Sequence, residues 1–277
     1  MPVSLPLPPP KKSVERIPRK IHYIWVGDKP LPEADKKRIN HWRKLHPDYE
    51  IKLWNEKNFD IESNYWTREA YKAKRFALVA DVIRIHVLKA EGGIYLDTDM
   101  ELLRPLDDLL QYEAFLSYDS NHWTGSSILG TVAGSTFIQR VWRRYDTVRG
   151  KISAGNTMKT FSCLGVLAGQ TYGVKLNGCT QEKNGFAIFE RHVFSPKHYA
   201  TGRLQMTTQT RGIHHFASSW HDQFFVRAST KLTGIAYKIL GEKVMTVVFE
   251  SPMLLCIKTI FWLEERQIRK VERTRET

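Results

Sequence analysis

The chain has 277 residues and a formal net charge of +13 at pH 7, with 42% hydrophobic and 26% charged residues. These proportions exclude an intrinsically disordered chain and predict a folded domain with a substantial core. The positive charge favours polyanionic partners, which are nucleic acid, an acidic membrane surface or a phosphorylated substrate, without choosing among them.

The sequence begins with a proline-rich, basic stretch, and we predict a flexible tail over residues 1–16. A short β-branched and aromatic run, residues 21–26, stops at Gly27 and predicts a buried strand. The polar segment 33–46 predicts a surface helix, and the alternating segment 49–56 predicts a second strand. A strand, a helix and a strand in this order indicate a parallel α/β unit.

The strongest helical pattern covers residues 68–90, where apolar residues recur at helical spacing and Gly92-Gly93 follow as a stop. Residues 94–96 then predict a very short strand. A turn at Pro105 and a helix that starts at Asp107 or Asp108 are expected next.

The last third of the chain gives weaker signals. Several Gly/Ser turns interrupt residues 121–185, and residues 229–277 are basic and amphipathic, which predicts a helical C-terminal segment. That segment could lie on an anionic membrane or pack on the domain with a solvated basic face, because the pattern fits both.

The chain has three cysteines, Cys163, Cys179 and Cys256, and none of them belongs to a C-x-x-C pair. This pattern argues against a cysteine zinc site and a disulfide framework, and it fits a reducing compartment. The sequence shows neither a signal-peptide pattern nor an uninterrupted apolar stretch of transmembrane length. We therefore expect a cytoplasmic protein, with the membrane hypothesis placing it at the periphery of the cytoplasmic face.

Asp97 and Asp99 follow the predicted strand 94–96 and are separated by one residue. In an extended segment this spacing puts both carboxylates on the same side, where they repel unless a cation lies between them. A hard divalent ion, Mg²⁺ or Mn²⁺, suits such a pair. Taken alone, a D-x-D tripeptide is more typical of two solvated loop carboxylates than of a metal site.

A second charged pair, Asp81 and Arg84, lies three residues apart on one face of the predicted helix 68–90. That face adjoins the apolar stripe. The pair is therefore either a partly buried ion pair or part of a pocket.

Residues 76–110, FALVADVIRIHVLKAEGGIYLDTDMELLRPLDDLL, resemble the signature of glycosyltransferase family 32, the sugar-binding region containing a DXD motif. The resemblance extends to residues 17–32 and 46–61. The family includes bacterial capsule and polysaccharide transferases and yeast Golgi mannosyltransferases, and the clostridial glucosylating toxins are related in structure. It implies an α/β fold: a GT-A-like, single Rossmann-like nucleotide-binding domain over residues 17–228, with a mixed, mostly parallel central sheet.

The resemblance also implies roles for individual residues. Trp25 would stack on the nucleotide base, and Tyr95 would lie beside the base or ribose. Asp81 would hydrogen-bond hydroxyls of the donor sugar, and Arg84 would contact the sugar or its phosphate. Asp97 would bind the ribose and a metal-bound water, while Asp99 would be the direct metal ligand.

A C-terminal motif is weaker. His215, Ser218 and Trp220 have the spacing of the family segment that closes over the diphosphate. His215 would be a metal or phosphate ligand, Ser218 a metal ligand, and Trp220 a donor to a phosphate oxygen. The choice between His214 and His215 stays open. In the middle of the chain no Gly-Pro pair is present, and Ser126 or Ser127 could line the pocket.

The implied reaction is retaining glycosyl transfer from a nucleotide diphosphate sugar to a glycan or lipid-linked acceptor, in capsular or other surface polysaccharide biosynthesis. Mn²⁺ or Mg²⁺ would assist, and a UDP-sugar is favoured over a GDP-sugar. Nucleic acid is not an expected partner, because RNA-binding signatures are absent from the sequence.

Three other functions compete with this interpretation. A D-x-D phosphatase would place its motif on the first strand, and a polymerase-β-type nucleotidyltransferase would place Gly-Ser before it, whereas Gly125-Ser126 follows it here. A non-enzymatic, basic membrane-binding module explains the net charge but not the carboxylate constellation.

Overall fold

The computed structural model describes residues 16–120, 123–147 and 164–217, with five single positions between 233 and 266. Most of the predicted tail 1–16 and the predicted helical segment 229–277 therefore lie outside the described residues, as does the predicted domain boundary at residue 228. In the described part, no helix has both the length and the apolar character that crossing a membrane requires.

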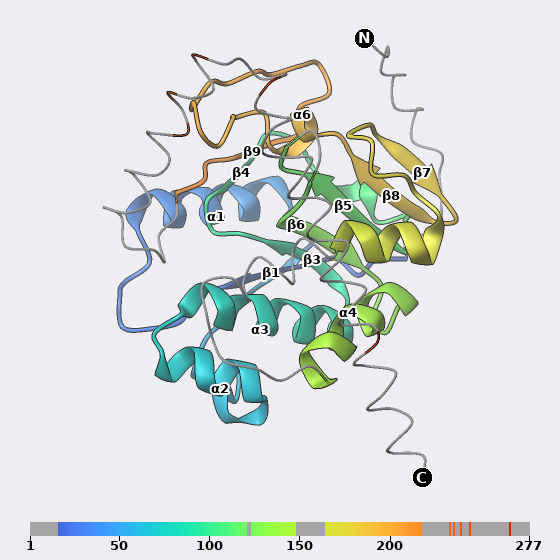
Figure 1. The fold of residues 1–277 in the computed structure, drawn as a ribbon. Coiled ribbons are helices and arrows are strands. Elements are labelled where there is room, and N and C mark those ends of the chain that lie inside the picture. Colours follow the sequence, from blue (N-terminus) through green and yellow to red (C-terminus); the bar gives the residue numbers. More distant parts are fainter. Residues whose placement is uncertain are drawn as a thin grey trace.

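A seven-stranded sheet forms the centre of the molecule (Figure 1). Strand β1 is parallel to both of its neighbours and β5 is parallel to β8, while the other three pairings are antiparallel. The predicted α/β class with a mixed central sheet is confirmed. The strands in spatial order are β2 (Glu50–Trp54), β1 (Lys20–Ile24), β3 (Gly93–Leu96), β6 (Thr124–Thr131), β5 (Ala114–Tyr118), β8 (Phe186–Phe189) and β7 (Gln181–Lys183).

Helices cover both faces of this sheet (Figure 1). One buried cluster joins one face to α2, α3 and α4, and a second joins the other face to α1 and α6. The helices are α1 (Glu33–Leu45), α2 (Tyr65–Lys72), α3 (Phe76–Glu91), α4 (Thr136–Thr147) and α6 (Arg191–Phe194), with single 3-10 turns η1 (Ile61–Ser63) and η2 (Asp107–Leu109). Residues 164–172 are also helical.

A small second sheet pairs β4 (Met100–Leu102) with β9 (Gly212–His214) in antiparallel register. The indole N–H of Trp42, on α1, donates to Met100 O at 3.0 Å and ties β4 to the helix layer. This sheet brings a late part of the chain beside the end of β3.

The helix predicted over 68–90 is interrupted. Ala73 ends α2, Lys74 takes a left-handed conformation with φ 54°, and α3 starts at Phe76. Apolar periodicity continues across the break, so the sequence pattern does not reveal it. Helix α3 is buried on nearly every side because the sheet, α2 and α4 surround it.

Most of the other predicted strands and helices are confirmed, and one predicted helix is wrong. The strands predicted near residues 21–26, 49–56 and 94–96 and the helix at 33–46 are confirmed, and β1 and β2 form the expected parallel unit. The helix predicted from Asp107 is wrong, since only the single turn η2 forms there before the chain enters β5 at Ala114.

Gly93 allows β3 to approach β1 closely. Its φ is +101°, and a Cβ atom there would lie 2.9 Å from Lys20 O and 2.9 Å from His22 Nε2. A side chain at this position would therefore push β3 away from the first strand. As the first residue of β3, Gly93 also helps to set where this strand places Asp97.

Two buried histidines, His22 on β1 and His46 after α1, have hydrogen bonds that require the neutral imidazole. His22 accepts the Trp54 indole N–H at Nδ1 (3.1 Å) and donates from Nε2 to Gly92 O (2.8 Å). His46 accepts the Leu106 N–H at Nε2 (3.0 Å), and its Nδ1 lies 3.1 Å from Trp42 O. Burial lowers the pKa of both imidazoles.

Because the pKa of His46 is lowered on folding, its contribution to stability is present above the unfolded pKa of 6.5 and lost as the pH falls below it. We expect the gap in free energy of unfolding between the wild type and His46→Gln to shrink from about pH 7.5 to about pH 5.5. This difference in free energy of unfolding can change by at most about 1.4 kcal/mol per pH unit, because a single proton is involved. Urea unfolding at both pH values measures the gap.

Asn40→Gln is the control for this experiment, because Asn40 lies on α1 with an exposed side chain that does not titrate. Its gap to the wild type should stay constant between the two pH values. An equally constant gap for His46→Gln would show that His46 is not held neutral.

Candidate functional site

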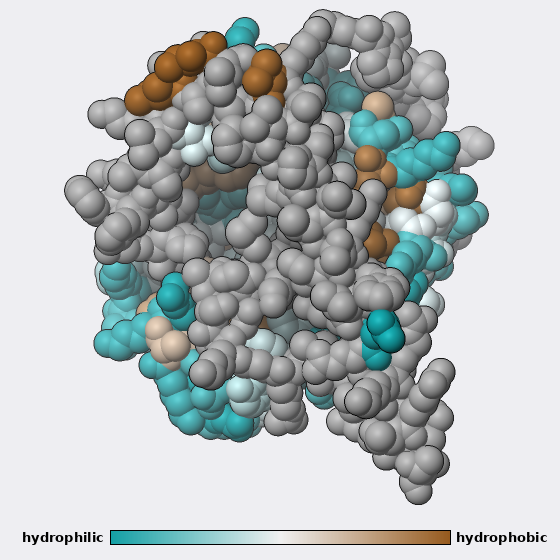
Figure 2. Space-filling model, in the orientation of Figure 1, coloured by the Kyte–Doolittle hydropathy of each residue, from teal (hydrophilic) through white to brown (hydrophobic). Residues whose placement is uncertain are grey.

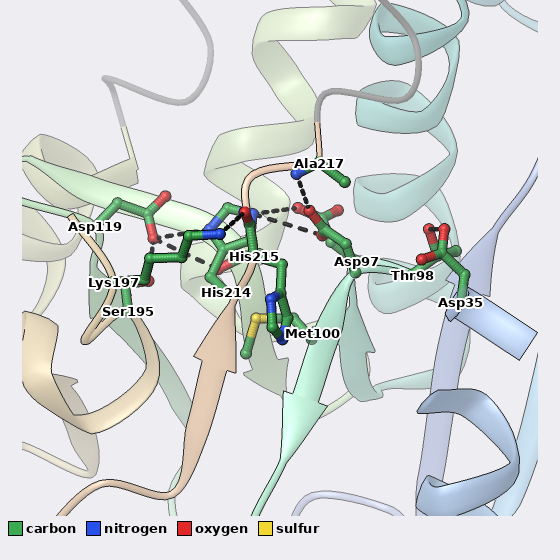
Figure 3. Close-up of polar contacts among 12 residues, drawn as sticks. Asp35, Asp97, Thr98, Met100, Asp119, Ser195, Lys197, His214, His215 and Ala217 are labelled. Atoms are coloured by element: carbon green, nitrogen blue, oxygen red, sulfur yellow. Dashed lines mark hydrogen bonds and ion pairs between the residues drawn. The ribbon is translucent and has the colours of Figure 1, made fainter. Parts of the chain in front are cut away.

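The aspartate pair lies in a turn at the carboxyl end of β3, closed by the Met100 N–H, which donates to Asp97 O at 3.0 Å. The carboxylates of Asp97 and Asp99 face the same side, since one oxygen of each lies within 4.8 Å of the other. Figure 3 shows Thr98 beside Asp35, away from His214. Thr98 turns away and donates through Oγ1 to Asp35 Oδ2 at 3.1 Å. The orientation predicted from the one-residue spacing is confirmed.

His214 completes a group of three possible metal ligands. The β4–β9 register places it opposite Met100. Its Nε2 lies 3.6 Å from Asp99 Oδ1 and 4.0 Å from Asp97 Oδ2. One ligand atom from each of the three side chains lies within 4.8 Å of the others.

His215 points elsewhere. Its Nε2 is 2.8 Å from Glu101 Oε2, while its backbone N–H donates to Asp99 O at 3.3 Å. Neighbouring residues of an extended chain direct their side chains to opposite sides, so only one of the two histidines faces the aspartates. The sequence favoured His215 and left the choice open, and the structure gathers His214 with Asp97 and Asp99.

Arg84 connects helix α3 to the aspartate pair. Its Nη2 lies 3.0 Å from Asp97 Oδ1, 3.0 Å from the Tyr95 hydroxyl and 3.6 Å from Asp81 Oδ1. The Tyr95 hydroxyl itself donates to Asp97 Oδ1 at 2.6 Å. Four of the residues selected from the sequence are thus in one connected cluster.

Asp81 and Arg84 are each 3% exposed, so their ion pair is buried and also adjoins the aspartates. Burial raises the pKa of Asp81 well above its usual value. Its Oδ2 is buried and, among the described residues, accepts no hydrogen bond. A buried acceptor of this kind is suited to a ligand hydroxyl.

The electrostatics concentrate negative charge around His214. Burial raises the pKa of Asp97 although Arg84 opposes it. For His214, burial alone would lower the pKa, but the carboxylates of Asp99 and Asp119 outweigh it and raise the pKa to about 9. The imidazole is therefore charged in this arrangement, where it offsets part of the carboxylate repulsion.

Asp119 is a site residue that the sequence analysis missed. Its Oδ1 lies 3.4 Å from His214 Nδ1 and accepts the Ser195 hydroxyl at 2.5 Å, and Ser127 Oγ is 3.5 Å away. A Cβ atom on Gly125 would lie 2.2 Å from Asp119 Cγ, so glycine there makes room for the carboxylate. Asp119 directly follows β5, as Asp97 follows β3, and this shared position at a strand end was the signal available in the sequence.

The remaining predicted residues are less informative. Trp25 is 9% exposed, and its indole N–H donates to Lys29 O at 2.6 Å. The Ala217 N–H donates to Asp99 Oδ2 at 2.7 Å. Ser218 and Trp220 lie outside the described residues. The roles expected for Trp25, Ser218 and Trp220 stay predictions.

The donor set fits a divalent cation. Asp97, Asp99 and His214 offer two carboxylate oxygens and one imidazole nitrogen from side chains that are only 27%, 10% and 11% exposed. Mg²⁺ favours oxygen ligands, whereas a mixed set of oxygen and nitrogen also suits Mn²⁺. The carboxylate of Asp119 beside Nδ1 leaves Nε2 as the nitrogen that faces the aspartates.

Residues 32–116 match the family described as "Glycosyltransferase sugar-binding region containing DXD motif". Among curated proteins, the chain is 35% identical over 135 residues to inositol phosphoceramide mannosyltransferase 3 of Schizosaccharomyces pombe, covering 46% of this chain and 36% of that protein. It is 32% identical over 133 residues to mannosyl phosphorylinositol ceramide synthase SUR1 of Saccharomyces cerevisiae, covering 47% and 34%. The chain thus matches about a third of the length of these relatives.

Among solved structures, the PaToxG glycosyltransferase aligns with a TM-score of 0.45 and 17% identity, covering 56% of this chain and 69% of that one. A glycosyltransferase involved in glycosylation of the major capsid of PBCV-1 gives a TM-score of 0.40 and 9% identity, covering 76% and 98%. The matched segment 32–116 includes Asp81, Arg84 and the Asp97–Asp99 pair. The resemblance of this chain to the glycosyltransferases with a DXD-containing sugar-binding region is therefore confirmed.

Proposed function

We propose that the protein is a metal-dependent glycosyltransferase that uses a nucleotide diphosphate sugar. The observation that carries the proposal is the cluster of Asp97, Asp99 and His214 at the end of β3, joined to the buried Arg84–Asp81 pair. The carboxyl edge of a sheet strand is also where α/β proteins bind ligands.

The residues of the cluster have different roles in the proposed reaction. A divalent cation, when bound, neutralises charge that develops on the departing diphosphate. Arg84 carries a fixed positive charge beside Asp97, and Asp81 Oδ2 is available to a sugar hydroxyl. Positioning and electrostatic stabilisation supply most of such a mechanism, so no protein nucleophile is required. The retaining course, with reaction on the front face of the donor, is proposed from the family resemblance.

The donor and acceptor are proposed from the relatives. The names of the curated relatives describe the transfer of mannose to an inositol phosphoceramide. This supports an activated hexose as the donor. Activated mannose is then a candidate donor together with the UDP-hexoses that the family resemblance favours. These names also support a lipid-linked acceptor, either a glycolipid or a precursor of a surface or capsular polysaccharide. We propose the cytoplasmic face of a membrane as the place of action, from the low cysteine count and the basic sequence.

Removing the carboxylate at position 99 should abolish donor cleavage. We expect Asp99→Asn to release nucleotide at least about a hundredfold more slowly than the wild type with Mn²⁺, because one of three cation ligands loses its charge. The measurement is nucleotide release from a panel of UDP- and GDP-sugars, with and without Mn²⁺.

Asp48→Asn is the matched control, since it makes the same chemical change at an exposed position outside the cluster. It should cleave the donor at the wild-type rate. If the wild type cleaves a donor and Asp99→Asn is as fast, the aspartate pair is not the reaction centre.

Asp119 should act as a positioning residue for His214. We expect Asp119→Asn to fold normally and to bind Mn²⁺ about 10- to 100-fold more weakly, the range seen when the carboxylate partner of a metal-binding histidine is removed. Calorimetric titration with Mn²⁺ alone measures this without any substrate. Wild-type affinity in Asp119→Asn would contradict the orienting role and leave the test at Asp99 unaffected.

A further inference from the structure

The segment from Arg191 to Ala217 contains no aspartate or glutamate. It holds four lysine or arginine residues and four histidines. Arg211 is paired with Asp108, whereas Arg203 is exposed and Lys197 is half-buried. A surface with cations and without its own carboxylates is complementary to a negatively charged partner.

This segment also carries several exposed large hydrophobic side chains. Four large hydrophobic side chains are exposed in the described ranges between residues 16 and 217. They are Leu103 (36%), Tyr199 (36%), Leu204 (49%) and Met206 (52%). Three of them lie within eight positions of one another in the segment, and the fourth, Leu103, directly follows β4. We refer to these four residues as the apolar rim.

Backbone hydrogen bonds hold the apolar rim together. The chain folds back on itself between Lys197 and Leu204, which form an antiparallel bridge. The Leu103 N–H donates to Arg211 O at 2.7 Å, and the exposed Arg104 donates to Thr208 O at 2.9 Å. Figure 2 shows hydrophobic side chains gathered at the upper edge of the molecule, where Figure 1 places this orange segment.

We propose that the apolar rim docks the protein on an anionic phospholipid bilayer. Aliphatic side chains such as Leu204 and Met206 insert at the boundary between headgroups and acyl chains, while Arg203 and Arg104 contact lipid phosphates. Scattered single hydrophobic residues on a surface need no partner, but four on one edge, three of them in a basic segment without acidic residues, are typical of an interaction site.

The apolar rim is joined to the candidate active site by a row of aromatic rings. The centroid of Tyr199 lies 6.4 Å from that of Phe216, and Phe216 lies 3.9 Å from His214. A bilayer on this edge would therefore lie next to the aspartate cluster. That the same bilayer supplies the acceptor rests on the proposed function, whereas the docking itself does not.

The test is co-sedimentation of the full chain with vesicles of phosphatidylcholine, with and without phosphatidylserine. We expect the wild type to prefer the anionic vesicles, and Leu204→Asp/Met206→Asp to bind them at least about tenfold more weakly. Arg203→Gln/Arg104→Gln should lose the preference for phosphatidylserine and most of the salt dependence.

Ala133→Asp/Thr136→Asp is the matched control. It adds the same charge at two exposed positions, one in the turn after β6 and one at the start of α4. This turn follows Thr131, which pairs with Gly93 at the end of β3 opposite to Asp97. It should bind like the wild type. The docking proposal is overturned if the wild type binds no vesicles, or if the Leu204/Met206 variant binds as well as this control, which would place any contact elsewhere in the chain.

Asp99→Asn separates the two proposals. It should bind vesicles like the wild type even though it is expected to lose donor cleavage. Vesicle binding without any donor cleavage in the wild type would contradict the transferase and leave the docking intact.

Discussion

Repulsion among the carboxylates of Asp97, Asp99 and Asp119 is the constraint that shapes this molecule. The three side chains approach one imidazole, that of His214, from the ends of two strands. Such a concentration of negative charge is unfavourable unless cations lie within it. Arg84 from α3 supplies part of that positive charge, and without a bound metal ion the protonated His214 imidazole supplies more. A metal ion bound by these side chains would take the place of the proton on His214. Gly125 gives the space that the Asp119 carboxylate requires.

The same residue type takes opposite charge states in this fold, and its surroundings explain why. His22 and His46 each have a ring nitrogen that accepts an N–H, so burial without an anionic partner keeps them neutral. His214 is equally buried but lies among carboxylates, which raise its pKa to about 9 although burial opposes this. Burial alone therefore does not determine the charge of a histidine, and the partner has to be known.

The sequence was informative where the signal is local. The short strand that ends at Leu96, and the common orientation of Asp97 and Asp99, follow from composition and from the alternation of an extended chain. The break at Lys74 was not predictable, because the apolar periodicity runs through it. The choice of His214 over His215 depends on the β4–β9 register, and the role of Asp119 depends on the convergence of β5 with Ser195. Both are set by tertiary contacts that no short window of sequence contains.

The pairing of β4 with β9 has a consequence for the order of assembly. The Glu101–His215 contact in this region spans 114 residues of chain, so the candidate metal ligands belong to segments that are far apart in the sequence. Closing such a long loop is costly in chain entropy and comes late in folding. A cation that binds both ends would act as a non-covalent cross-link, favouring the native state over every partly folded form in which β9 is detached. Resistance of residues 191–214 to proteolysis would then follow the concentration of free metal.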